Sequence, residues 1–425
     1  MQAIIIGIII LFFIILFLKD FDKYYVLFIV VNPLIREFST QPLLSPISTF
    51  IFLSSIASII YLYKYKWTFI QWKNKGIFWV IVILCISVLV SDHYASERHP
   101  LNVYSIIINY TNILIYCDVL RHHPKEIIRH TFRYSLIFGG IVGSFALFEM
   151  LTSYNPYIHF TSFLKIYSEN TIITEMRFGI KRTQTFFSMH ETNAGVSFLL
   201  ITLLSFIRAK GETIRTSKIC YLVIFLLGLN IFASGSRAAI IGLLILSCLL
   251  LRKKNLKMIL VLSPFILLLI NFFLHDYLNN IISSFTNTEN IAGSNIDMRS
   301  QQFNIALYYL SKSPWIGHGI AYTWNYVAIY DHEIFGAESL WLPVIIDQGL
   351  LGVTTYILFF LYSLYYAISK KNAQLCFFIV GFVIFNSLSS IPKVPFSYIY
   401  IVLFAIIESN KLFKNNAPIH YHPSL

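Results

Sequence analysis

The chain has 425 residues, of which 57% are hydrophobic and only 12% are charged, whereas about 25% of an ordinary soluble domain is charged. Its formal net charge of +12 comes from lysines and arginines in short clusters between apolar runs, which is typical of membrane topology and not of a nucleic-acid-binding surface. These values exclude a soluble enzyme and a nucleic-acid partner, and they predict an all-α, polytopic integral membrane protein surrounded by membrane lipids.

The apolar runs predict 12 or 13 membrane-spanning helices, because about 20 apolar residues cross a bilayer. The second run is short and contains Pro33, so whether it crosses, re-enters or fails to form stays open. In chain order the candidates lie near residues 2–18, 24–40, 47–63, 77–92, 103–120, 133–152, 193–208, 217–233, 237–251, 257–274, 341–369, 374–388 and 394–409.

Lysines and arginines are divided unequally between the two sides of this predicted bundle. When the sides alternate along the chain, 22 of the 32 fall on one side, which the positive-inside rule makes cytoplasmic. Both long connections then lie outside. The predicted order is N-terminal transmembrane helices at 1–152, an outer loop at 153–192, central transmembrane helices at 193–274, a large outer loop at 275–340, C-terminal transmembrane helices at 341–409 and a cytoplasmic tail at 410–425.

The sequence Ser234-Gly235-Ser236-Arg237 separates two apolar runs and leaves no room for a loop, which places Arg237 at or below the outer face of the membrane. An arginine at this depth is energetically costly. It either snorkels and anchors the next span, or it clamps an anion, since a guanidinium forks onto phosphate oxygens and the small neighbours admit a bulky headgroup.

A second arginine follows in Asp297-Met298-Arg299, ahead of an apolar-periodic stretch. It is either a solvated residue of a surface helix or a further anion contact. The stretch ends in Ser313-Pro314-Trp315-Ile316-Gly317-His318-Gly319, where we expect a sharp turn. The Gly-His-Gly triplet is too short for a dinucleotide-binding fingerprint.

Two acids accompany the span predicted at 341–369. Glu338 lies just before it and is either a helix cap or the general base that activates a hydroxyl nucleophile. Asp347 lies deeper, and we expect it to pair with an arginine or an amide inside the bundle.

Arg182 lies in a basic, threonine-rich stretch ahead of His190 and the next span. Thr192 or Asn193 is expected to cap that span's helix. His190 is either a hydrogen-bonded interface residue or a base, because the pKa range of histidine allows both.

No histidine, cysteine or acidic cluster in the sequence has metal-ligand spacing, and no Walker loop is present. We therefore expect neither a metal nor another cofactor, and the energy for a reaction would come from the substrate or from a gradient.

In order and spacing these motifs resemble the O-antigen polymerase and ligase superfamily over roughly residues 175–370. The resemblance implies a membrane-embedded glycosyltransferase of the C type, which uses undecaprenyl-diphosphate-linked glycans at the periplasmic face of the inner membrane without an essential metal. It is carried by Arg182 to Asn193, Ser-Gly-Ser-Arg237, Asp-x-Arg299 with Ser-Pro-x-x-Gly-x-Gly319, and Glu-Ser-x-Trp-Leu342 with Gly-x-x-Gly352.

The resemblance also assigns expected roles. Arg237 and Arg299 match the family arginines thought to hold the diphosphate, and with Glu338 as base they form the expected catalytic set. Arg182 matches a further basic position. The expected substrate-binding set is Arg182, His190, His318 and Asp297.

Ligases of this superfamily typically carry a histidine where this chain has Glu338, which favours a polymerase of O-antigen or capsular polysaccharide. A ligase that moves finished polymer to lipid A core remains the nearest alternative, and a flippase or transporter of the same lipid-linked glycan comes third. A chain-length regulator and a flippase are the expected protein partners.

Overall fold

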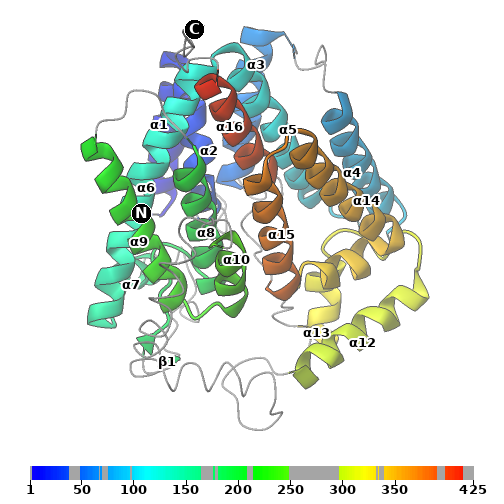
Figure 1. The fold of residues 1–425 in the computed structure, drawn as a ribbon. Helices are drawn as coiled ribbons and strands as arrows, with labels where there is room; N and C mark the ends of the chain where they lie inside the picture. Colours follow the sequence, from blue (N-terminus) through cyan, green and yellow to red (C-terminus); the bar gives the residue numbers. More distant parts are fainter. Residues whose placement is uncertain are drawn as a thin grey trace, which may run out of the picture.

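The computed structural model describes residues 2–37, 48–66, 68, 75–95, 98–163, 176–177, 180–207, 214–247, 296–331, 334, 339–389 and 398–414. These residues form a helical bundle that also holds a short antiparallel pair of two-residue strands (Figure 1). The elements in chain order are α1 (Gln2–Lys19), α2 (Phe21–Glu37), α3 (Thr49–Tyr65), α4 (Lys75–His93), α5 (Pro100–His122), α6 (Pro124–Thr152), α7 (Pro156–Phe163), β1 (Met176–Arg177), β2 (Ile180–Lys181), α8 (His190–Phe206), α9 (Ile214–Ala233), α10 (Arg237–Ser247), α12 (Ile296–Lys312), the π-helix η5 (Thr323–Val327), α13 (Ala328–Tyr330), α14 (Trp341–Ser369), α15 (Ala373–Leu388) and α16 (Tyr398–Lys414).

Four of the described helices, α4, α5, α6 and α14, are long and apolar enough to cross a membrane, and shorter apolar helices lie in α1, α3, α9, α10 and α15. Large apolar side chains such as Ile4, Ile8 and Leu11 point outward along α1, which suits a surface bathed in lipid. The prediction of an all-α, polytopic membrane protein is confirmed.

The helix limits show that the second apolar run does form a helix. α2 forms a helix that continues through Pro33, although proline removes one backbone hydrogen bond. α10 begins at Arg237 and α14 covers 341–369, both as predicted. The candidate span at 257–274 lies outside the described residues.

The centre of the bundle is occupied by α8 and α16. Every residue of α16 from Tyr398 to Ile407 is buried, and α8 exposes only a small part of its surface. A helix that is apolar on all sides and enclosed by others fits this position.

Glycines allow the closest helix contacts. A Cβ added at Gly143 on α6 would lie 2.8 Å from the Leu226 Cβ on α9, and one added at Gly242 on α10 would lie 3.2 Å from the Gly381 carbonyl oxygen on α15. Small residues let helices in a membrane approach until their backbones touch. The contact between α10 and α15 matters for the site described below, because α10 begins beside it and α15 ends beside it.

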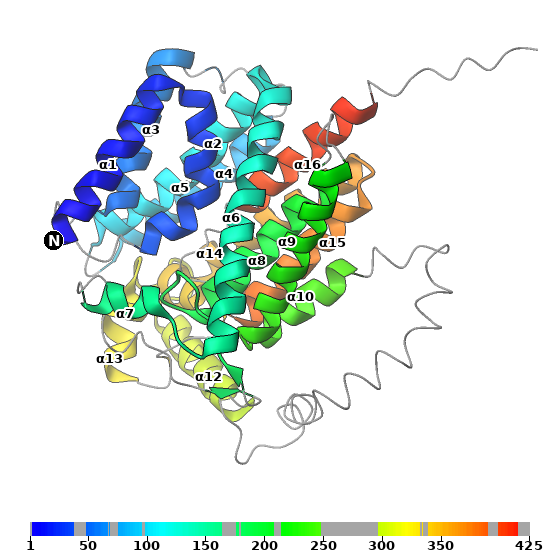
Figure 2. The ribbon, with the colours of Figure 1, turned by 90° about the vertical axis from the view of Figure 1, so that its left-hand side faces the viewer.

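One end of the bundle carries the non-spanning elements. Figure 1 places α7, β1, α12 and α13 at this end and the C-terminal end of α16 at the opposite end. Since α10 and α15 run antiparallel (Figure 2), the start of α10 at Arg237 and the end of α15 at Leu388 also lie here. We call it the site end.

Candidate functional site

Arg182 and His190 lie together at the site end, close to the Ser-Gly-Ser turn. The Arg182 residue is 4% exposed. Its Nε donates a hydrogen bond to the Ser234 carbonyl oxygen at 3.1 Å, and its Nη2 contacts His190 Nε2. Glu191 Oε1 also lies against His190 Nε2. Because a buried guanidinium is costly without acceptors and opposite charge, these contacts fix Arg182 in place and join two of the predicted motifs.

An amide and hydroxyl network behind Arg182 ties this loop to α8 and α9. Asn230 Nδ2 donates to Asn193 Oδ1 at 2.8 Å, and Asn193 Nδ2 donates to the Thr183 carbonyl oxygen at 3.1 Å. The Thr185 hydroxyl donates to Asn193 Oδ1 at 2.8 Å, and the Thr183 hydroxyl to Asn230 Oδ1 at 2.9 Å. All four residues are at most 1% exposed, so the network rigidifies the loop.

The start of α8 differs from the prediction. The helix begins at His190, and Met189 precedes it without a side-chain cap. The expectation that Thr192 or Asn193 caps this helix is therefore wrong. Asn193 lies inside α8 because its amide bonds to the neighbouring loop and to α9 in place of its own helix end.

Two buried carboxylates hold the same loop from its other side. Glu149 Oε2 on α6 accepts hydrogen bonds from the Gln184 N–H at 3.1 Å and the Thr185 N–H at 2.8 Å, while Glu37 Oε2 on α2 accepts one from the Ser188 N–H at 3.1 Å. Both acids are 0% exposed. The sequence reasoning overlooked them, although an acid inside an apolar run is a signal of a structural or functional role.

The Ser-Gly-Ser turn between α9 and α10 is as tight as predicted. Gly235 has φ 65°, a conformation that favours glycine. The Ser236 N–H donates to the Ser234 hydroxyl oxygen at 3.3 Å, and Arg237 follows at once as the half-buried first residue of α10.

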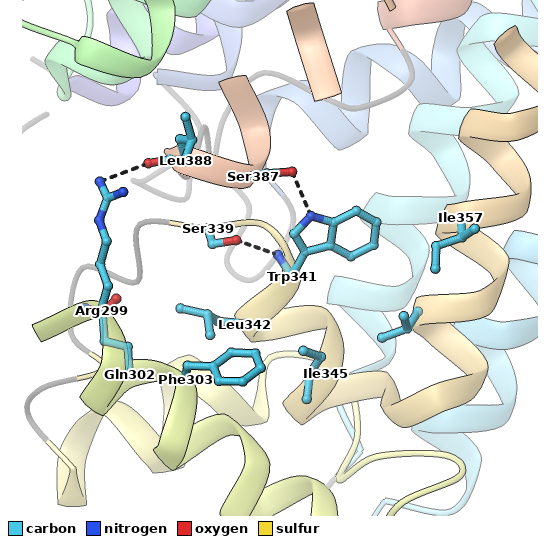
Figure 3. A pocket seen from close by; sticks show the side chains of 11 residues that line it. Arg299, Gln302, Phe303, Ser339, Trp341, Leu342, Ile345, Ile357, Ser387 and Leu388 are labelled. Carbon is cyan, nitrogen blue, oxygen red and sulfur yellow. Dashed lines mark hydrogen bonds between the residues drawn. The ribbon is translucent and has the colours of Figure 1, made fainter. Parts of the chain in front are cut away.

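Arg299 lies beside a cavity of about 490 Å³ between α12, α14 and α15 (Figure 3). Its Nη2 donates to the Leu388 carbonyl oxygen at 3.4 Å. Away from Arg299 the walls are mainly apolar. The lining residues are Arg299, Gln302, Phe303, Ser339, Trp341, Leu342, Ile345, Val353, Ile357, Ser387 and Leu388. An apolar chamber with a guanidinium on one wall can hold a hydrocarbon chain next to an anion.

Trp341 fixes the wall of this cavity at the start of α14. Its indole Nε1 donates to the Ser387 hydroxyl oxygen at 2.8 Å, and its backbone N–H donates to the Ser339 hydroxyl oxygen at 3.2 Å (Figure 3). The Leu340 N–H also donates to the Asn386 carbonyl oxygen at 3.0 Å. The bonds to Ser387 and Asn386 join α14 to the end of α15.

Gly317 and Gly349, which the sequence places in separate motifs, interlock. Gly317 has φ 68° and Gly349 has φ 61°. A Cβ on Gly317 would lie 2.5 Å from the Asp347 carbonyl oxygen, and a Cβ on Gly349 would lie 2.6 Å from the Gly317 nitrogen. The Leu350 N–H donates to the Pro314 carbonyl oxygen at 2.9 Å across the break in α14. This glycine contact docks the C-terminal end of α12 onto α14.

Asp347 completes the same junction. Its Oδ1 accepts hydrogen bonds from the Thr323 N–H at 2.8 Å and the Thr323 hydroxyl at 2.6 Å, and its Oδ2 accepts one from the Ala321 N–H at 2.9 Å. Within the described part of the chain, Asp347 thus pairs with backbone amides and a hydroxyl, and not with an arginine. Asp347 therefore holds η5 against α14.

The remaining predicted residues are placed as follows. His318 is half-buried, and its Nε2 donates to the Tyr309 carbonyl oxygen at 2.8 Å. Asp297 lies in the first turn of α12, on the same helix as Arg299. Glu338 lies outside the described residues, so its role stays a prediction. Among the residues that the structure describes, no group of three histidines, cysteines or acids could hold a metal ion.

The junction of Gly317, Gly349 and Asp347 lies in a part of the chain that matches a known protein family. The family model described as O-antigen ligase matches residues 222–357, about a third of the chain. The match supports the predicted polymerase and ligase superfamily, whose members are membrane glycosyltransferase-like enzymes that act on lipid-linked glycans; it does not separate polymerase from ligase. No curated protein matches the chain.

The matched segment contains Arg237, Arg299, His318 and Gly349, where α14 is interrupted by a non-helical residue. It begins after Arg182 and His190, so it does not include them. The contacts between Arg182, His190 and the Ser234 carbonyl therefore link residues outside the segment to a turn inside it.

Proposed function

We propose that this protein polymerises undecaprenyl-diphosphate-linked oligosaccharide repeat units into O-antigen or capsular polysaccharide at the periplasmic face of the inner membrane. The observation that carries the proposal is the apolar cavity with Arg299 on its wall, which is lined mostly by residues of the segment that matches the O-antigen ligase family. A lipid-linked diphosphate combines the same two features, a hydrocarbon chain and an anionic head.

Arg299 and Arg237 would hold the diphosphate of the donor. The acceptor hydroxyl oxygen of an incoming repeat unit forms a bond to the anomeric carbon of the growing chain, and the bond from that carbon to the diphosphate oxygen breaks. The electron pair leaves with undecaprenyl diphosphate, where negative charge develops and where guanidinium groups lower the barrier most.

Glu338 is the proposed base that takes the proton of the acceptor hydroxyl. Arg182 and His190, held close to the Ser-Gly-Ser turn, would set the shape of the substrate site beside Arg237. The remaining proposed contacts to substrate are His318 and Asp297.

The alternative from the same superfamily is a ligase that moves finished polymer onto lipid A core. The glutamate at position 338 favours the polymerase, because ligases typically carry a histidine there. A chain-length regulator and a flippase are the proposed protein partners of the polymerase.

The test is deletion of the gene, followed by gel analysis of the surface glycan and complementation with wild type, Arg237→Ala or Arg121→Ala. Core that carries a single repeat unit, restored by wild type and by the exposed control Arg121→Ala but not by Arg237→Ala, would support the polymerase. Core without any repeat, with polymer retained on undecaprenyl diphosphate, would identify a ligase. An unchanged ladder of chain lengths would contradict both.

A further inference from the structure

We propose that the aromatic column formed by His318, Tyr322, Tyr326 and Tyr330 is a binding platform for the oligosaccharide part of the substrate, away from the reacting bond. The inference rests on the proposed function, since it assigns a place to the sugars of the same lipid-linked glycan. These residues lie four apart along the segment from His318 through η5 and α13.

The first two neighbouring ring pairs of the column are stacked, with interplanar angles of 20°, and the outermost pair, Tyr326 and Tyr330, is tilted by 44°. Ring centroids are 4.7 Å apart between His318 and Tyr322, 4.9 Å between Tyr322 and Tyr326, and 4.7 Å between Tyr326 and Tyr330. At its inner end Tyr309 meets both His318 and Tyr322 edge-on, at 5.8 and 6.0 Å. The column therefore grows outward from the buried junction of α12 and α14.

The base of the column is rigid, because the same contacts that dock α12 onto α14 also support it. The Asp347 carboxylate binds the Ala321 and Thr323 N–H groups, and the Tyr309 hydroxyl donates to Asp331 Oδ2 at 3.0 Å. Burial and this bond raise the pKa of Tyr309, so its phenol stays a protonated donor. A preordered platform costs little conformational entropy when a ligand binds.

The outer end of the column is open and amphipathic. Tyr326 is 44% exposed and Tyr330 is 67% exposed. Beside them the Asn325 amide Nδ2 lies 3.3 Å from His99 Nε2. The exposed aromatic surface of Tyr326 and Tyr330 at the outer end, edged by phenol, amide and imidazole groups, matches a sugar chain, whose rings present C–H faces bordered by hydroxyls.

The position of the column relative to Arg299 fits one continuous substrate. Arg299, Gln302, Ala306 and Tyr309 follow each other at intervals of three or four residues, so they share one face of α12. Tyr309 is ten residues beyond Arg299, or about 15 Å along the helix. Gln302, Ala306 and Tyr309 are buried on this face, so a glycan whose diphosphate is bound at Arg299 would have to span this distance outside the helix contact to reach the column.

The experiment measures binding of lipid-free oligomers of the strain's own repeat unit to the full-length protein in nanodiscs. We expect affinity to fall about tenfold in the double variant Tyr326→Ala/Tyr330→Ala, because two aromatic contacts are lost, and to change little in Tyr326→Phe/Tyr330→Phe, which keeps the rings. The matched control is Tyr365→Ala on α14, which removes a tyrosine that is 65% exposed.

Equal affinity of the alanine double variant and wild type would overturn the proposal, as would an equal loss in Tyr365→Ala. A Tyr330→Trp variant tests the competing occupant: strong quenching of the new fluorescence by brominated acyl chains would place the column in the bilayer and also overturn it. Gene deletion separates the two proposals, since an unchanged surface glycan would contradict the polymerase while leaving the binding result intact.

Discussion

The Arg182 loop and the Arg299 cavity lie at the same end of the bundle, but they surround their arginines in different ways. Arg182 is buried against the Ser234 carbonyl and His190, and asparagines and carboxylates from four helices hold its loop. Arg299 borders an open apolar cavity, and its Nη2 donates to the Leu388 carbonyl at 3.4 Å. Under the proposed function, the first arginine would build the site and the second would meet the substrate.

The largest effect is expected at the glycine contact that supports the cavity. Gly317→Ala and Gly349→Ala should each cost about 3 kcal/mol or more, because a Cβ there meets backbone atoms and both residues have positive φ. Thermal unfolding of the purified protein and polymer yield in cells should both fall. The control is Gly228→Ala on α9, where a Cβ would meet nothing within 4 Å; an equal loss there would contradict the explanation.

The next largest effect is expected at Arg299, where the reaction rate should change and the stability of the protein should not. Arg299→Ala should lower the polymerisation rate about 100-fold, as expected for removal of a charged contact to a developing anion, while the unfolding temperature stays close to that of wild type. Arg299→Lys should recover part of the rate, since lysine keeps the positive charge but cannot form the two parallel hydrogen bonds of a guanidinium. A normal rate in the alanine variant would remove Arg299 from the proposed site.

Arg182 should behave in the opposite way. Arg182→Ala is expected to destabilise the protein by about 2 kcal/mol, because the buried Ser234 carbonyl and His190 lose their partner. Polymer yield should then follow the amount of folded protein. A variant with normal unfolding temperature but no polymer would show that Arg182 contacts substrate directly, and the contrast drawn above would fail.

The smallest effect is expected at the cavity wall. Trp341→Phe removes the indole bond to the Ser387 hydroxyl and keeps most of the apolar surface, so it should cost about 1 kcal/mol. Denaturation in detergent measures this loss, and Trp341→Ala, which also empties part of the wall, should cost several times more. Equal costs for both variants would mean that the hydrogen bond, not the ring, holds α14 to α15.

Much of the fold could be predicted because its signals are local. Long apolar runs fix helices wherever the chain crosses lipid, and the start of α10 at Arg237 and the extent of α14 follow from charge and hydropathy alone. The helix across Pro33 and the start of α8 at His190 could not be read in this way. Both depend on packing against helices distant in sequence.

By itself the sequence determined the membrane class, the polar motifs and the family resemblance, because composition and motif order do not depend on how the helices pack. Only the tertiary structure decided how these motifs combine. Glu149 reaches Thr185 across 36 residues, and Gly349 meets Gly317 through a break in α14. The first contact depends on how α6 packs against the Arg182 loop, and the second requires two backbones to approach where side chains would otherwise lie. The same packing creates the cavity beside Arg299.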